Sequence, residues 1–154
     1  MSKKKILIVE DDGIVAMDLQ FTLQRSGYNV VGHAPSGKEA IKLLGEAQPD
    51  LVLMDIRLRG ILDGIQTSHK IRSQLDVPIV YLTAHADEDT LGRAQETEPY
   101  GYLVKPFQDE ELRATVQMAL YKHNMEKKLR ESEEKYRTLS ETMAQGVVYQ
   151  DRDG

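Results

Sequence analysis

The chain has 154 residues and a formal net charge of −5, from 20 Lys and Arg against 25 Asp and Glu, and this acidic balance argues against direct nucleic-acid binding. Its 40% apolar and 29% charged residues are typical of a soluble globular protein and exclude a disordered chain or one embedded in a membrane. The absence of cysteine excludes disulfides, thiolate chemistry and cysteine-ligated zinc, and it fits a cytoplasmic protein.

Short runs that are apolar at every position predict the strands. They occupy residues 6–9, 30–31, 51–54, 79–82 and, more weakly, 100–104. Continuous apolarity, rather than alternation, is typical of strands buried on both faces, as in a parallel sheet. The run at 6–9 ends after four residues, which is too short for a signal peptide or a membrane span.

The segments between these runs have the apolar spacing of helices. The first segment carries a broad apolar stripe at three-to-four spacing, formed by Ile14, Val15, Met17, Leu19, Phe21 and Leu23. A capping box over 36–39 predicts the start of a second helix, and a third helix is predicted after Asp63-Gly64.

Two further helices complete the pattern. The fourth is predicted over 87–95 and is apolar only at Leu91 and Ala94, so we expect it to be the most loosely held. The fifth begins near Asp109, where three acidic residues suit a helix N-terminus. Its buried face is predicted to comprise Leu112, Val116 and Leu120. Strand and helix thus alternate five times over about 120 residues, which implies a doubly wound α/β fold with a parallel sheet and right-handed crossovers.

Beyond residue 120 a single apolar stripe continues along an otherwise charged helix. It comprises Tyr121, Met125, Leu129, Ser132, Tyr136, Leu139 and Met143, at spacings of 4, 4, 3, 4, 3 and 4. Such a stripe favours pairing with another helix, so we expect a homodimer through an extended C-terminal helix. The alternative is a solvated helical tail, because the stripe only approaches the length of a coiled coil and Ser132 interrupts its apolar character.

The last residues predict the beginning of a further domain. The segment 145–150 is predicted to be one strand, followed by the start of a turn. A lone strand has no partner for its backbone, so we interpret 144–154 as the opening of another domain. We therefore expect one domain over 1–120, a helical connector over 121–143 and a truncated domain over 144–154.

Polar residues follow the predicted strands. In open α/β sheets, ligands bind beyond the carboxyl ends of the strands, where strand order reverses. The residues at these ends are Glu10, Asp11, Asp12, Asp55, Thr83, Ala84 and Lys105. Turns are commonly polar, so each residue alone is weak support for a site. Together they are stronger, because crowded carboxylates repel one another and a divalent cation relieves that repulsion. Ligands that are all oxygens favour Mg²⁺.

The same residue types suit the formation of an aspartyl phosphate. That chemistry needs a carboxylate nucleophile and nearby groups that neutralise the phosphoryl oxygens. Asp55 ends a buried apolar run and is the predicted nucleophile. Lys105 would pair with one phosphoryl oxygen, Thr83 would donate its hydroxyl to another, and the small side chain of Ala84 would leave room for the group.

These motifs resemble the receiver domain of two-component response regulators, over about residues 4–120. The segments that carry the resemblance are, in chain order, 6–12, 53–56, 63–65, 82–84 and 102–107. The resemblance implies a flavodoxin-like sheet with strand order 2-1-3-4-5. It also implies a phosphorylation-controlled switch that catalyses its own Mg²⁺-dependent phosphorylation and slow autodephosphorylation rather than turning over a substrate.

The resemblance also assigns roles to individual residues. Asp55 would receive its phosphoryl group from a histidine kinase or a phosphotransfer protein. Asp11 would bind Mg²⁺ directly and Glu10 through water, and the backbone carbonyl of Arg57 would complete the protein's share of the coordination. Asp12 matches a variable position and is expected to be peripheral.

A second set of roles concerns the switch. Thr83 would move toward the phosphoryl group and the ring of Tyr102 would turn inward behind it. Lys105 would bind the phosphate and form a cis peptide bond with Pro106. Arg57 and His85 are expected to rim the pocket, beside Ala84.

Two departures from common receivers identify a subgroup. The stretch 55–64 is one residue longer than usual and lacks the frequent proline, which resembles receivers found before PAS and sensor-kinase regions. Residues 134–149 resemble the entry to a PAS domain. A downstream PAS or kinase region in the same full-length chain is therefore an expected partner.

Three alternative functions remain open. One is a pseudo-receiver that serves as a protein-binding scaffold, although such a scaffold would not need the complete residue set. Another is a Mg²⁺-dependent phosphohydrolase, but the position two residues after the nucleophile is Arg57 rather than the acid such enzymes use. A flavin-binding protein is disfavoured, because the first strand leads into acids instead of a phosphate cradle.

Overall fold

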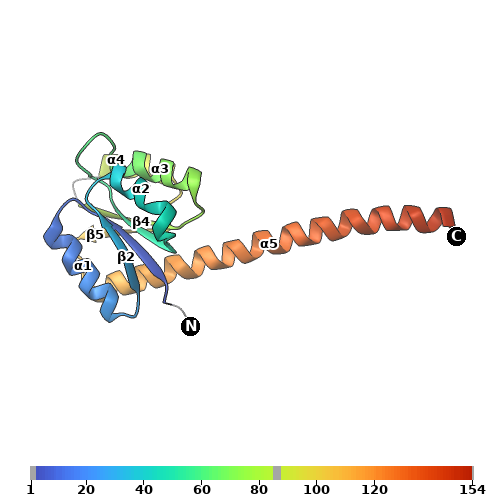
Figure 1. Ribbon diagram of the computed structural model, residues 1–154, viewed down its shortest axis with the longest axis horizontal. Coiled ribbons are helices and arrows are strands. Elements are labelled where there is room, and N and C mark those ends of the chain that lie inside the picture. The colour runs from blue at the N-terminus through green and yellow to red at the C-terminus, as the bar shows by residue number, and fades with distance from the viewer. Residues whose placement is uncertain (1–2, 85–87, 154) are drawn as a thin grey trace. The chain divides into compact units, whose positions relative to one another are not determined.

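The computed structural model describes the backbone of residues 3–84 and 88–153, and the side chains of these residues except 88–89 and 142–153. Strands and helices alternate along the described chain (Figure 1). In order they are β1 (Lys5–Val9), α1 (Gly13–Arg25), β2 (Asn29–Ala34), α2 (Gly37–Ala47), β3 (Leu51–Asp55), α3 (Gly64–Gln74), β4 (Ile79–Ala84), α4 (Glu88–Gln95), β5 (Gly101–Lys105) and α5 (Asp109–Asp153).

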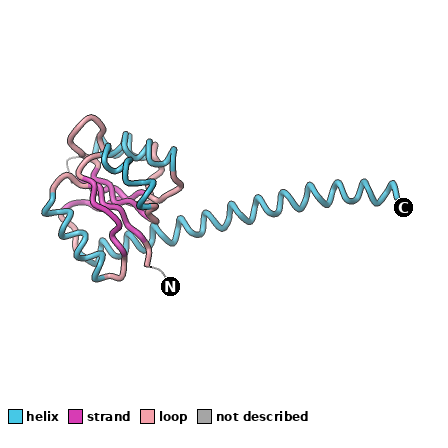
Figure 2. The backbone as a smooth tube through the Cα atoms, viewed as in Figure 1, coloured by secondary structure: helices cyan, strands magenta, loops and turns pink. Residues whose placement is uncertain are grey.

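The strands form a five-stranded parallel sheet in the order β2-β1-β3-β4-β5. Figure 2 shows it as the magenta layer between helices. The doubly wound fold and its predicted strand order are therefore confirmed. The chain moves from β1 outward to β2 and then returns to the other side of β1 as β3. The carboxyl ends of β1 and β3 consequently lie side by side at the point where the strand order reverses.

Each face of the sheet has its own apolar core. Alternate residues of β1 point to opposite faces, so Leu7 and Val9 pack with helices α2, α3 and α4, whereas Ile6 and Ile8 pack with α1 and the first part of α5. All five residues of β3 are buried. This double coverage explains why the predicted strands are apolar at every position.

The broad stripe predicted on α1 divides into two faces. Leu19 and Leu23 are buried together with Ala16, but Ile14, Met17 and Phe21 are 82%, 71% and 60% exposed. At about 100° per residue, these two triplets lie on nearly opposite sides of a helix. The small side chain of Ala16 sits on the buried face, and the exposed triplet forms an apolar surface on the outside of α1.

Helix α5 extends through the residues predicted to be a strand. It runs from Asp109 to Asp153, so the strand expected over 145–150 is wrong. A helix satisfies its backbone groups within the segment, whereas a strand needs a neighbour. Within the described ranges, the strands belong to the single sheet and none pairs with this segment.

The chain divides into two compact units, residues 1–121 and 122–154. In the first unit, Leu112 and Val116 of α5 are buried against the sheet as predicted, whereas Leu120, also predicted to be buried, is only partly buried. Over the part of the chain that the structure describes, no helix combines the length and apolarity needed to cross a bilayer.

Candidate functional site

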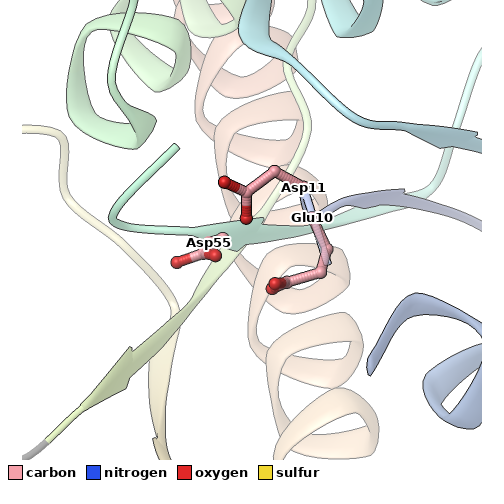
Figure 3. Close-up of side chains that lie close together, drawn as sticks. All are labelled: Glu10, Asp11 and Asp55. Atoms are coloured by element: carbon pink, nitrogen blue, oxygen red, sulfur yellow. The ribbon is translucent and has the colours of Figure 1, made fainter. Parts of the chain in front are cut away.

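Three carboxylates meet at the carboxyl ends of β1 and β3. Glu10 and Asp11 directly follow β1, and Asp55 is the last residue of β3. Each of them offers an oxygen that lies within 4.8 Å of the others, and Figure 3 shows the three side chains gathered beside the end of β3. The strand order predicted from the sequence is what brings these residues together, because β1 and β3 are neighbours.

Backbone contacts position the two buried acids, and the N–H of Asp12 donates to Glu10 Oε1 at 3.3 Å. Glu10 and Asp55 are both buried, and Asp11 is partly exposed. The N–H of Arg57 donates to Asp55 Oδ1 at 2.9 Å, which orients that carboxylate. On the β2 side, the N–H of Glu10 donates to the carbonyl of Ala34 at 3.1 Å, and His33 Nε2 lies 2.7 Å from the Glu10 carbonyl oxygen.

Lys105 places a positive charge among these acids. It is the last residue of β5, and its Nζ lies 3.1 Å from Glu10 Oε2 and 3.6 Å from Asp55 Oδ2. Burial by itself lowers the pKa of Lys105, but the charges of Asp55 and Glu10 outweigh burial and the pKa is raised. The lysine is therefore protonated at neutral pH. The predicted cis bond between Lys105 and Pro106 is confirmed.

Glu10 and Asp55 hold protons more tightly than free carboxyls do, because the pKa of each is raised. Burial, followed by the charge of Asp55, raises the pKa of Glu10 to about 7. Burial also raises the pKa of Asp55, although the Arg57 N–H and the Lys105 charge oppose that shift. One lysine thus leaves the negative charge of three carboxylates incompletely balanced. Their oxygens are the hard ligands that suit a divalent cation.

The start of α3 lies against the backbone of Asp55, the predicted nucleophile. The N–H of Gly64 donates to the carbonyl of Ile56 at 3.2 Å. A Cβ at position 64 would overlap the carbonyl oxygen of Asp55 and lie 2.8 Å from the Cα of Ile56. Only glycine allows this approach. The pair Asp63-Gly64 predicts a helix start from its sequence, but the pattern does not reveal this close approach to Asp55.

The predicted switch residues lie at the ends of β4 and β5. Thr83 is buried, and its Oγ1 donates to the carbonyl of Ala84 at 3.2 Å. Ala84 is exposed. The ring of Tyr102 stacks on that of Tyr81, with centroids 6.1 Å apart, and the Tyr102 hydroxyl is buried without a hydrogen-bond partner among the described residues.

Tyr81 is a residue that sequence reasoning missed. It is fully buried, and its hydroxyl lies 2.8 Å from Oγ1 of Thr97, which itself donates to the carbonyl of Ala94 in the last turn of α4. Arg72 of α3 adds hydrogen bonds to the carbonyls of Thr97 and Glu98 at 2.9 and 2.8 Å. A polar hydroxyl within the apolar run 79–82 was the available signal, because a buried tyrosine usually finds a partner.

The remaining predicted site residues have different positions. Asp12 caps α1, accepting from the N–H groups of Ile14 and Val15, which explains its place beside the cluster. The Arg57 side chain is exposed, and His85 lies outside the described residues. Arg59, which was not predicted, pairs with Asp11 at 3.4 Å, but its exposed position makes the pair a weak contribution to stability.

Comparisons with known proteins point to one family. The profile of the response regulator receiver domain family matches residues 6–117. The transcriptional regulatory protein PdtaR of Mycobacterium tuberculosis is 38% identical over 117 residues, which cover 76% of this chain and 57% of that protein. The chain thus spans little more than half the length of this curated relative.

Two solved structures are similar over most of their own length. The signal receiver domain of a modulated diguanylate cyclase from Desulfovibrio desulfuricans is 35% identical, with a TM-score of 0.77, over 81% of this chain and 99% of that one. The N-terminal domain of a response regulator/sensory box/GGDEF 3-domain protein from Carboxydothermus hydrogenoformans is also 35% identical, with a TM-score of 0.74, over 80% and 98%.

Proposed function

Because the chain belongs to the response regulator receiver domain family, we propose that it is a phosphorylation-controlled switch in which Asp55 accepts a phosphoryl group from a histidine kinase or a phosphotransfer protein. The observation that carries this proposal is the meeting of Asp55, Glu10, Asp11 and Lys105 at one end of the sheet. A scaffold without phosphorylation would not require a buried carboxylate held between two further acids and a lysine.

The transfer forms one bond and breaks another. An oxygen of Asp55 attacks the phosphorus of the donor's phosphohistidine, and the phosphorus–nitrogen bond breaks with its electron pair returning to the imidazole ring, which takes up a proton. The Arg57 N–H holds Asp55 Oδ1, and Lys105 lies beside Oδ2. Lys105 is therefore positioned to neutralise charge on a phosphoryl oxygen as the new bond forms.

We assign Mg²⁺ to the acidic cluster. Asp11 and Asp55 would bind the ion directly, Glu10 would act through water, and the backbone carbonyl of Arg57 would contribute a further oxygen. The three carboxylates fit a hard divalent cation in donor type and spacing. When bound, the ion supplies neutralisation of the charge on the phosphoryl oxygens.

Thr83 and Tyr102 would carry the change away from Asp55. The Thr83 hydroxyl would leave the Ala84 carbonyl for a phosphoryl oxygen, and the ring of Tyr102 would follow it. Tyr102 stacks on Tyr81, whose hydroxyl contacts Thr97 just beyond α4. This contact supports α4 and β5 as the elements that respond.

An apolar hollow beside Lys105 is a suitable docking place for the protein that donates the phosphoryl group. It is lined by Ile14, Val15, Asp18, Lys105, Pro106 and Phe107. The exposed triplet Ile14, Met17 and Phe21 continues this apolar surface along α1. A helix that carries the donor histidine could pack here and bring its phosphoryl group to Asp55.

The downstream receiver of the signal would be a PAS or sensor-kinase region that follows in the full-length protein. The similar protein from Carboxydothermus hydrogenoformans is described as a response regulator joined to a sensory box. In this proposal 121–143 is the connector and 144–154 leads into the next domain, and the backbone of 144–153 continues α5 as helix.

The proposal is tested by incubating the protein with acetyl phosphate and Mg²⁺ and following its mass. A switch gains one phosphoryl group per chain and loses it slowly. A phosphohydrolase would instead release phosphate through many rapid turnovers, and a scaffold would show no gain. Beryllofluoride should produce the same conformational change as phosphorylation, because it mimics the phosphoryl group.

Mg²⁺ affinity is expected to rise as the pH is increased from 6 through 8. The pKa of Glu10 lies at about 7 instead of 4.5, so the ion and a proton compete for the cluster near neutrality. Isothermal titration calorimetry in two buffers of different ionisation enthalpy should show proton release on binding, and Glu10→Gln should remove most of this release.

The same shift has a stability consequence. A carboxyl whose pKa is raised by folding contributes stability that is present below about pH 4.5 and is lost as the pH rises through about 7. The ion-free protein should therefore lose stability across this range, and Mg²⁺ should restore it. Equal Mg²⁺ affinity at pH 6 and pH 8 would contradict the assignment of Glu10 to the cluster.

A further inference from the structure

The second unit of the chain carries an exposed apolar seam. We define the α5 seam as Met125, Leu129, Ser132, Tyr136 and Leu139. Its four large side chains are each at least 45% exposed, and the residues beside them are mainly charged. From Met125 onward the seam alternates spacings of four and three, which is the pattern of positions d and a in a coiled coil. Leu129 and Tyr136 are then a positions, and Ser132 and Leu139 are d positions.

The charges that flank the seam distinguish the possible partners. Lys128 and Lys135 occupy g positions, and Glu133 occupies an e position. In a parallel pair of identical helices, each g residue lies opposite the following e residue of the other helix, so Lys128 meets Glu133. An antiparallel pair would bring g against g and place lysine against lysine. The charges therefore complement a second, parallel copy of the same helix.

The spacing also fixes where a regular coiled coil can begin. Met125 and Leu129 are four residues apart, which is the regular step from a d position to the next a position, so Met125 is a d position. Tyr121 and Met125 are again four residues apart, although continued heptads would place Lys122 at the seam instead. An insertion of this kind locally unwinds a coiled coil. Residues from Met125 onward can consequently form left-handed heptad packing, while the turn before Met125 is straighter.

The small side chain of Ser132 leaves space along the seam. A surface hollow on α5 is lined by Ser132, Glu133, Tyr136, Arg137 and Ser140. Side chains of a neighbouring helix fill such holes in coiled-coil packing. A polar d position also lowers the stability of the pair, so association should be reversible rather than permanent.

We propose that α5 pairs with a second copy of this chain as a parallel, in-register two-stranded coiled coil through the α5 seam. Lys128 of each copy faces Glu133 of the other. This pairing stands on the helix itself and does not depend on phosphorylation of Asp55. If α5 did not pair in this way, the proposed function of the receiver would be unaffected.

A charge-reversal series tests the pairing in the full 154-residue chain. Sedimentation velocity over a concentration series should show a reversible dimer. Glu133→Lys replaces the two attractive Lys128–Glu133 pairs by two repulsive pairs of lysines. It should therefore raise the dissociation constant of the dimer about tenfold. The matched control Glu134→Lys makes the same charge change at the outward f position and should leave association unchanged. The double variant Lys128→Glu/Glu133→Lys should restore the wild-type dimer.

Several outcomes would overturn the proposal. These are a wild-type chain that stays monomeric, a trimer, equal effects of the two lysine variants, or a double variant that is not restored. Circular dichroism of each variant checks that α5 remains helical, so that a loss of helix is not mistaken for a loss of pairing.

A cross-linking experiment tests the register independently. The chain has no cysteine, so a single introduced cysteine can form a disulfide only with the same position of another copy. Ser132→Cys lies at the seam, where Cα atoms of a parallel pair approach closely enough for a disulfide. Thr138→Cys lies at an outward c position. Mild oxidation should cross-link the first variant and not the second, and similar cross-linking of both would contradict a parallel, in-register seam.

Discussion

Replacing Asp55 by Asn is expected to abolish phosphorylation by acetyl phosphate while leaving the protein folded. The amide keeps the size of the side chain but lacks the nucleophilic carboxylate. Burial raises the pKa of Asp55, so the charged form is disfavoured at this position. The neutral side chain should therefore raise the melting temperature in the absence of Mg²⁺. Intact-mass spectrometry and a thermal melt measure the two effects.

Asp12→Asn is the matched control for this experiment. It removes the same charge from an acid next to the cluster, and asparagine caps a helix as well as aspartate does. The Asp12 side chain caps the first turn of α1, and its backbone N–H, which donates to Glu10 Oε1 at 3.3 Å, is kept by the substitution, so phosphorylation should persist in this variant. A mass gain in Asp55→Asn equal to that of the wild type would place the phosphoryl group on another residue and refute the assignment.

Gly64→Ala is expected to destabilise the protein by roughly 1–3 kcal/mol, the usual cost of forcing extra atoms into a packed interior. The new Cβ would overlap the backbone of Asp55 and approach that of Ile56, and backbone atoms cannot move aside as a flexible side chain can. The same substitution should weaken Mg²⁺ binding, since any relief of the clash displaces the residue that carries the nucleophile. Urea denaturation and calorimetry measure these two changes.

Gly13→Ala is the control for the glycine experiment. Gly13 is the first residue of α1, as Gly64 is of α3, but a Cβ there would meet no atom within 4 Å. Alanine is the better helix former by about 1 kcal/mol, so this variant should be as stable as the wild type or more stable. If Gly64→Ala behaved in the same way, the close approach of α3 to the nucleophile's backbone would have no energetic consequence.

The acidic cluster and the lysine could be predicted from the sequence because the strand is the unit that positions them. Runs that are apolar at every position reveal parallel strands, and parallel strands place their carboxyl ends at one edge. Glu10, Asp55 and Lys105 follow such runs, so their meeting required no knowledge of individual contacts. The five-stranded architecture could be predicted for the same reason.

Other features depend on geometry that a sequence does not display. The buried face of α1 includes Ala16, a residue too small to stand out in a hydrophobic pattern, so the pattern does not distinguish it from the exposed apolar face. The role of Gly64 depends on which backbone atoms lie nearby, and that of Tyr81 on a threonine sixteen positions away. The helical state of 145–150 depends on whether a neighbouring strand is present, which the local pattern of apolar residues does not reveal.

The anchoring of one end of α4 has a mechanical consequence. Tyr81 reaches Thr97 from β4, and Arg72 holds the carbonyls of Thr97 and Glu98 from α3. These contacts lie just beyond the C-terminal end of α4, which has eight residues. Any rotation of α4 would therefore turn about a pivot at Thr97, and the helix would act as a lever about 12 Å long. A small adjustment of Tyr102 against Tyr81, close to the pivot, would be amplified toward Glu88.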